Sequence, residues 1–141
     1  MKDYSIGVDL NEVRCLPWRI YFLHPKESHS YKAGDFIGFI PRNGLMGEKF
    51  EGRLVGKRIA GLPGDLLEVK NDVLYINHQK VAALNPEYIK KLRRVSGGFD
   101  RTEVIPSERL LVLGTDDYSY DGRYWGTLSY KSIVGAITPI F

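Results

Sequence analysis

The sequence predicts an all-β (mainly β) fold with one short helix. Short runs rich in β-branched and aromatic residues recur along the chain, and turn signals such as Pro-Gly at 63–64 and Ser-Gly-Gly at 96–98 separate them. Only residues 86–94 space their apolar side chains as a helix does. The 141 residues are 43% hydrophobic, which suffices for one modest core, so we expect one domain spanning residues 1–141.

Four strands are expected in the N-terminal half. Residues 5–10 alternate weakly and lead toward Cys15, and residues 18–23 form an aromatic-rich run that ends at a His-Pro turn. Residues 35–41 and 50–59 complete the set, with a glycine-rich loop between them. The last of these strands carries Lys57.

The C-terminal half is expected to hold a hairpin pair, the helix and three further strands. Residues 66–69 and 73–76, with a turn at 77–80, are typical of a small hairpin pair. The helix over 86–94 is followed by strands at 104–106, 109–113 and 133–140.

Lys57 is unusual because it lies in an apolar strand, between Val55 and Ile59, and turn residues follow at once. Burial disfavours the charged form of a lysine, so a lysine in such a place can act as a general base near pH 7. A solvated lysine on an edge strand is the alternative interpretation.

Cys15 is the only cysteine, which excludes an internal disulfide and a multi-cysteine metal site. It is either a buried apolar thiol or a reactive one. Pro17 fixes its own φ and keeps Leu16 out of the helical region, so the thiol lies in a conformationally restricted segment.

The stretch Lys-Arg-Ile-Ala-Gly-Leu-Pro-Gly-Asp at 57–65 resembles the Lys-Arg-x-x-Gly-x-Pro-Gly-Asp segment that carries the catalytic lysine of type I signal peptidases. The resemblance is closer still to the relatives that mature pilins in conjugative transfer systems. Three more segments match in the family's order: Asn-Glu-Val-Arg-Cys-Leu-Pro at 11–17, Lys-Ala-Gly-Asp-Phe-Ile at 32–37 and Ser-Tyr-Asp-Gly-Arg-Tyr-Trp-Gly at 119–126. The resemblance implies a signal-peptidase-like fold, in which antiparallel sheets form a partial barrel.

The same resemblance implies a catalytic dyad of Cys15 and Lys57, in which a thiol stands where the family has a serine. A thiolate forms far more readily than an alkoxide, so the base has less to do, and the resting pair can be an ion pair. A cysteine–histidine pair is the alternative, but His24, His29 and His78 all fall in turns that are expected to lie on the surface.

Further roles are carried over from the family. Ser119 corresponds to the serine that hydrogen-bonds to the lysine, Asp121 and Arg123 to a supporting ion pair, and Gly122 to a position that usually holds serine. Arg58 is expected to support the site. An apolar substrate groove that favours small side chains before the cleaved bond is expected to be bordered by Val13, Leu16, Pro17 and Val55. Val13 stands where the family often has an oxyanion-binding hydroxyl, which leaves backbone amides, chiefly that of Cys15.

Charge and composition bear on whether the protein binds nucleic acid, lipid or a metal. The net charge is +3, and the basic residues gather only at 90–94, which favours a solvated face, with anionic lipid headgroups as a further possibility, and no nucleic-acid partner. We expect no metal and no cofactor, because Asp116 and Asp117 lack further ligands at suitable spacing. No apolar run reaches the roughly 18 to 20 residues that span a bilayer.

The resemblance therefore predicts a peptidase at the periplasmic face of the bacterial inner membrane. Its partners would be an exported protein or pilin precursor and the inner-membrane surface. Family members usually carry an N-terminal membrane anchor, so either the anchor is absent from this chain or the protein docks by other means. Because amines attack a thioester readily, the enzyme could also join peptide ends, as in pilin cyclisation. A catalytically inactive pilus-assembly homologue and a membrane-surface peptide-binding β-module are the alternatives.

Overall fold

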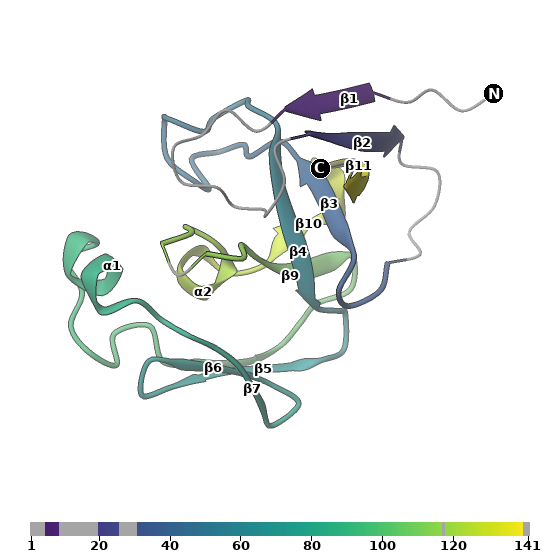
Figure 1. The fold of residues 1–141 in the computed structure, drawn as a ribbon. Coiled ribbons are helices and arrows are strands. Elements are labelled where there is room, and N and C mark those ends of the chain that lie inside the picture. Colours follow the sequence, from purple (N-terminus) through teal and green to yellow (C-terminus); the bar gives the residue numbers. More distant parts are fainter. Residues whose placement is uncertain (1–4, 9–19, 26–30, 117, 140–141) are drawn as a thin grey trace.

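The computed structural model describes residues 5–8, 20–25, 31–116 and 118–139, and their strands form two antiparallel sheets. The larger sheet has the order β1-β2-β11-β3-β4-β9-β10, and the smaller has the order β7-β6-β5-β8. Figure 1 shows the smaller sheet below the larger one, with the two helices on one side. The strands of the larger sheet are β1 (Ser5–Val8), β2 (Ile20–Pro25), β3 (Phe36–Phe39), β4 (Val55–Gly61), β9 (Arg109–Leu113), β10 (Leu128–Ser129) and β11 (Ile133–Pro139).

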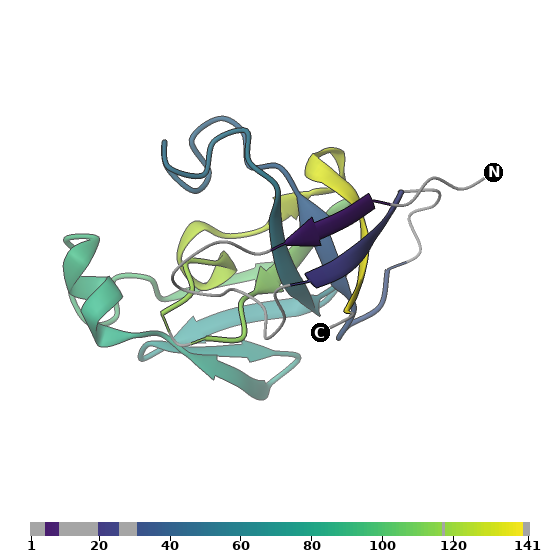
Figure 2. The same ribbon diagram turned by 45° about the horizontal axis from the view of Figure 1, so that its top comes forward.

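The smaller sheet is built from the middle of the chain. Its strands are β5 (Leu66–Lys70), β6 (Val73–Ile76), β7 (Gln79–Ala83) and β8 (Arg101–Val104), and helix α1 (Pro86–Lys91) joins the last two. Helix α2 (Gly122–Trp125) and a 3-10 turn (Tyr130–Ser132) follow β9. The turned view in Figure 2 shows β1 and β2, which form one edge of the larger sheet, on the side away from α1.

A tight turn passes the chain from the larger sheet to the smaller. The Asp65 amide donates to the Leu62 carbonyl at 3.0 Å, Pro63 and Gly64 occupy the two central positions, and Gly64 has a φ of +90° that favours glycine. The Asp65 side chain accepts a hydrogen bond from the Leu62 amide at 2.9 Å. The Gly-x-Pro-Gly-Asp part of the lysine segment, residues 61–65, therefore forms the turn that directs the chain from β4 into the smaller sheet.

Two apolar cores lie on the two faces of β9. Leu110 and Val112 point into the core of the larger sheet, while Leu111 and Leu113 point into the core shared with the smaller sheet and α1. This arrangement follows from the period-two alternation of a strand whose four consecutive apolar residues are buried on both faces. Strand β9 therefore forms the boundary between the two halves of the structure.

The expected fold class is confirmed, with differences in detail. The helix is shorter than residues 86–94, because the chain turns at Arg93, whose φ is +57°, and the Arg94 amide bonds back to the Ile89 carbonyl at 2.9 Å. Residues 50–54 belong to the loop before β4 rather than to the strand.

Strands β7 and β10, helix α2 and the 3-10 turn were not expected from the sequence, and β8 lies at Arg101–Val104 and not at 104–106. The expected turn at 77–80 is only two residues long, because Asn77 and His78 both have positive φ values and close a tight hairpin, so β7 begins at Gln79. His24 lies in β2, opposite Ala136 of β11, and not in a turn.

Glu68 of β5 gives the smaller sheet a testable pH dependence. Its carboxylate is buried and contacts Lys70 Nζ at 2.8 Å and His78 Nδ1 at 3.1 Å. The hydrogen bond from Lys70, followed by the charges of Lys70 and His78, holds the pKa of Glu68 below its ordinary value. A lowered pKa adds stability above the unfolded-state pKa, and this stability is lost as the pH falls through the folded-state value.

We therefore predict that Glu68→Gln flattens the acid limb of the stability profile. The free energy of unfolding of the unchanged protein should fall more steeply than that of the variant below about pH 4.5, the ordinary range of a glutamate pKa. Urea titrations from pH 7 to pH 3 measure this difference. Glu48→Gln, at an exposed carboxylate, is the control. Parallel profiles for Glu68→Gln and the unchanged protein would contradict the prediction.

Candidate functional site

Lys57 lies fully buried in the middle of β4. Its exposed fraction is 0%, and it shares one face of the strand with Val55 and Ile59, both members of the apolar core of the larger sheet. Gly56 and Arg58 point to the other face and are half-buried. An ammonium group loses hydration when it is buried in this way, so the position is unfavourable for a lysine without a role.

The neighbouring strands place two family segments beside Lys57. Lys57 pairs with Ile37 of β3, whose chain enters the sheet from the turn over 32–35, where Asp35 Oδ2 accepts a hydrogen bond from the Lys32 amide at 3.2 Å. On the other side, Arg58 pairs with Leu113, the last residue of β9. The chain therefore leaves β9 and begins the loop toward α2 directly beside Lys57.

Asp121 and Arg123 hold that loop in place through a buried ion pair. Arg123 Nε and Nη2 donate to the two carboxylate oxygens of Asp121, each at 2.9 Å, and the exposed fractions of the two side chains are 4% and 0%. Asp121 also accepts from the Gly114 amide at 3.0 Å and caps α2 through the Arg123 amide at 3.0 Å. The two ends of the loop are thereby closed on one carboxylate.

The remaining donors of Arg123 tie the loop to the smaller sheet. Nη1 donates to the Ala83 carbonyl at the end of β7 at 2.8 Å, and Nη2 donates to the Ser119 carbonyl at 3.1 Å. Arg101 of β8 adds bonds to the carbonyls of Gly122 at 2.9 Å and Arg123 at 3.2 Å. A guanidinium suits this task because its donors form a rigid planar fork.

Ser119 lies inside the loop with an exposed fraction of 1%. Its hydroxyl oxygen has no hydrogen-bond partner among the residues that the structure describes. Leaving a buried hydroxyl unpaired costs about 1–3 kcal/mol, so this serine is poorly explained by packing alone. The structure therefore shows no hydrogen bond from this hydroxyl to Lys57, and the catalytic role expected for Ser119 stays a prediction.

Gly122 has a packing reason to replace the serine usual in the family. A Cβ atom there would lie 2.5 Å from Leu111 Cδ1 and 3.0 Å from the Val112 carbonyl oxygen. Helix α2 therefore packs closely against β9 here, and a side chain at this position would require Leu111 to shift. The glycine accounts for this contact and is no sign that the site has decayed.

The other expected site residues divide into two groups. Cys15, Val13, Leu16 and Pro17 lie outside the described residues, as does His29. Val55 is buried on the same face of β4 as Lys57, whereas Arg58 points to the opposite face. His78 has an exposed side chain and bonds to Glu68, away from Lys57.

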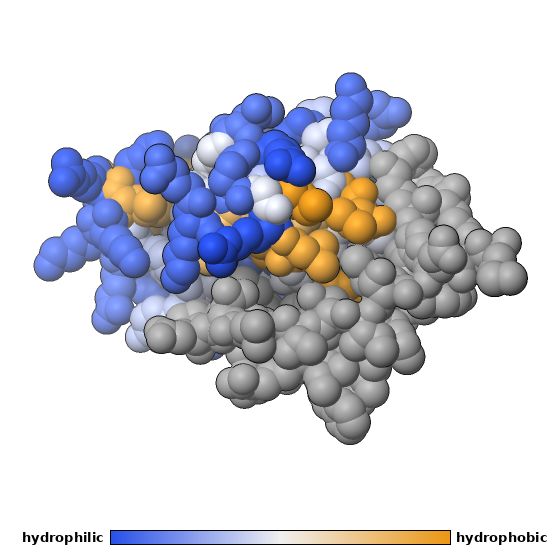
Figure 3. Space-filling view, turned by 90° about the horizontal axis from the view of Figure 1, so that it is seen from above, coloured by the Kyte–Doolittle hydropathy of each residue, from blue (hydrophilic) through white to orange (hydrophobic). Residues whose placement is uncertain are grey.

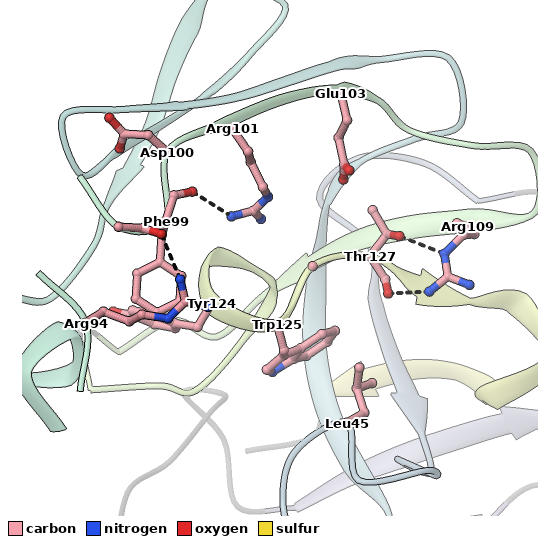
Figure 4. Close-up of a pocket in the computed structure, with 12 residues that line it drawn as sticks. Leu45, Arg94, Phe99, Asp100, Arg101, Glu103, Arg109, Tyr124, Trp125 and Thr127 are labelled. Atoms are coloured by element: carbon pink, nitrogen blue, oxygen red, sulfur yellow. Dashed lines mark hydrogen bonds between the residues drawn. The ribbon is translucent and has the colours of Figure 1, made fainter. Parts of the chain in front are cut away.

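Arg101 is part of the arrangement but carries no signal in the sequence. Arg101 stands in a strand of ordinary composition, and burial lowers the pKa of its guanidinium, opposed by the charge of Glu103. Figure 4 shows Arg101 reaching toward α2 from β8. Only the register of the smaller sheet brings it to the carbonyls of the loop, so spacing along the chain could not have indicated it.

A separate hollow of about 470 Å³ lies between the smaller sheet and α2, and it does not include Lys57. Three arginines line it: Arg94, Arg101 and Arg109 (Figure 4). Each of them donates to backbone carbonyls, as Arg94 does to Gly98 at 2.9 Å and Arg109 to Thr127 at 2.7 Å. These guanidinium groups brace the chain, and the candidate site is the region around Lys57.

Comparison with known proteins points to one family. The sequence model described as signal peptidase, peptidase S26, matches residues 16–141, a range that begins immediately after Cys15. Signal peptidase I V of Bacillus subtilis is 34% identical over 91 residues, 58% of this chain and 54% of its own length. Signal peptidase I of Bacillus caldolyticus is 40% identical over 91 residues, 57% of this chain and 50% of its own length.

A solved structure supports the same relationship. A signal peptidase I from Enterococcus faecalis superimposes with a TM-score of 0.51 at 27% identity, over 79% of this chain and 100% of that one. The present chain spans about half the length of the two Bacillus relatives.

The buried ion pair yields a prediction for stability. Asp121→Asn should lower the free energy of unfolding by about 3–5 kcal/mol, because it leaves the Arg123 guanidinium buried beside a neutral amide. Asp116→Asn is the matched control, since Asp116 is exposed and lies in the same loop. Urea unfolding of the two variants gives the comparison, and equal losses for both would contradict the role of the pair.

Proposed function

Because this chain belongs to the signal peptidase family, peptidase S26, we propose that it is an endopeptidase of signal-peptidase type that acts on exported precursor proteins. The observation that carries the proposal is the complete burial of Lys57 in an apolar strand, beside a loop fastened by Asp121 and Arg123. A buried lysine amine in its neutral form can accept a proton at neutral pH, which is the task of a general base.

The nucleophile that we propose is Cys15. The Cys15 Sγ atom transfers its proton to Lys57 Nζ and attacks the carbonyl carbon of the scissile peptide bond. The tetrahedral intermediate then collapses, the C–N bond breaks, and the departing amine takes the proton from Nζ. This leaves an acyl thioester on Cys15, which water hydrolyses to a carboxylate while the thiol is restored.

The proposed substrate is an extended segment of a membrane-anchored precursor, in particular a conjugative pilin. The segment would add as a strand beside the parts of the chain that carry Cys15 and Lys57. Seen from above, the molecule shows a group of apolar side chains next to hydrophilic ones (Figure 3). Leu54, immediately before β4, is 39% exposed and would offer an apolar contact at the start of the lysine strand.

The place of action that we propose is the periplasmic face of the bacterial inner membrane. Among the described residues, no helix has both the length and the apolar composition that crossing a bilayer requires.

The thioester permits a second outcome at the same site. An amine attacks a thioester readily compared with water, so the amino end of the same pilin chain can take the place of water and close a ring. Closing the ring by this route forms one new peptide bond and restores the thiol. Cyclisation is therefore proposed as a possible product of the dyad, alongside simple cleavage.

Processing of a membrane-anchored pilin precursor by four proteins tests the proposal: the unchanged chain, Cys15→Ala, Cys15→Ser and Lys57→Ala. We expect both alanine variants to lose cleavage by at least about 10³-fold, as removal of a member of a catalytic pair does in comparable enzymes. Cys15→Ser should keep part of the activity if the hydroxyl can replace the thiol. Full cleavage by Cys15→Ala would sink the catalytic assignment.

Mass spectrometry of the same products separates cleavage from joining. A cyclic product is lighter by one water than the linear cleaved chain. A product that always has the linear mass would rule out cyclisation and leave the peptidase assignment standing.

An inactive pilus-assembly homologue is the competing interpretation. The close packing of α2 on β9 gives Gly122 a structural reason that is independent of activity. Fast modification of Cys15 by a small alkylating reagent, compared with a free cysteine peptide, counts against an inactive homologue, because a structural thiol is inert.

A further inference from the structure

Three tyrosines form a cluster that joins helix α1 to the loop beside Lys57. Tyr88 of α1 stacks on Tyr120 with ring centroids 6.1 Å apart and an interplanar angle of 21°. Tyr124 of α2 lies 5.3 Å from Tyr88 and 6.0 Å from Tyr120. Ring pairs at these separations contribute stabilisation beyond the burial of their area.

Tyr120 has a special place in this cluster. It stands between Ser119, with its buried hydroxyl, and Asp121, which closes the loop, and its ring packs against both apolar cores. Burial raises the pKa of its phenol, so the ring stays neutral at ordinary pH. The packing of this ring therefore helps to fix the part of the loop that carries Ser119 and Asp121.

Hydrogen bonds fix the start of α1 to the same cluster. The Asn85 amide, at the start of α1, donates to the Tyr124 hydroxyl at 2.8 Å, and the Ala83 carbonyl, two residues earlier, accepts from Arg123 at 2.8 Å. The segment from β7 into α1 is thus fixed to α2, and its first helical turn presents Tyr88 to Tyr120. Residues that follow the smaller sheet thus contact and fix a loop of the larger sheet.

We propose that Tyr88 is a positioning residue for the reaction, which acts through the ring of Tyr120 to fix Ser119 and its loop, a loop that starts beside Lys57 at the end of β9. This inference rests on the proposed function of Lys57. Tyr88 lies 31 positions from Ser119 in the sequence and outside every segment that matched the family. The smaller sheet and α1 would accordingly fix the position of the loop that adjoins the proposed catalytic lysine.

The test measures kcat, KM and the unfolding temperature for cleavage of the membrane-anchored precursor. We expect Tyr88→Leu to lower kcat about tenfold with KM changed by less than about twofold, because a misplaced catalytic group impairs the chemical step. Tyr88→Phe keeps the ring and should restore kcat to within about twofold of the unchanged value. Tyr75→Leu, on the far face of β6, is the matched control and should leave kcat unchanged.

A double-mutant comparison separates positioning from a general loss of stability. In a Ser119→Ala background, Tyr88→Leu should change kcat by less than about twofold, since the group that it positions is already absent. If Tyr88→Leu does not unfold cooperatively, Tyr88→Met takes its place in both backgrounds, as a flexible apolar side chain that fills the same space. An equal fold-loss in both backgrounds, or a loss no greater than that of Tyr75→Leu, overturns the inference.

Lys57→Ala is measured in the same assay to keep the two proposals apart. Activity retained by Lys57→Ala overturns the proposed function. Activity lost by Lys57→Ala but unaffected by Tyr88→Leu overturns only the positioning role.

Discussion

The buried ion pair of Asp121 and Arg123 is the interaction on which the candidate site depends. One carboxylate receives two guanidinium donors and two backbone amides, and the same guanidinium reaches the carbonyls of Ala83 and Ser119. The pair therefore joins the end of β9, the start of α2 and the end of β7 at one point. A buried pair of this kind adds little net stability compared with an apolar replacement, so its value here lies in fixing geometry.

That geometry explains how one chain can hold a lysine inside an apolar sheet. Lys57 occupies a position between Val55 and Ile59 that an aliphatic residue would fill at lower cost, and the loop closed by Asp121 begins beside it. The general base that we propose needs a fixed place, and the loop held by Asp121 and Arg123 begins beside it.

Much of this arrangement was predictable from local sequence. Strand β9, the turn at 62–65 and the lysine strand follow from apolar runs and turn residues, and the signal-peptidase resemblance grouped Lys57 with residues 119–126. Local sequence patterns did not predict the contacts that depend on the register of the strands. Nothing around Arg101 or Tyr88 indicates that either approaches the loop, because their partners lie more than twenty residues away along the chain. Helix α2 was missed because four residues give too few turns for a periodic pattern.

The most direct test of the central claim is the pH dependence of Cys15 alkylation in the unchanged protein and in Lys57→Met. This measurement needs no substrate and reports whether the two groups share a proton. If Lys57 accepts the proton of the thiol, the apparent pKa of Cys15 lies below the ordinary cysteine value of about 8.5 in the unchanged protein and rises to that value or above in the variant. The same apparent pKa in both proteins would contradict the account.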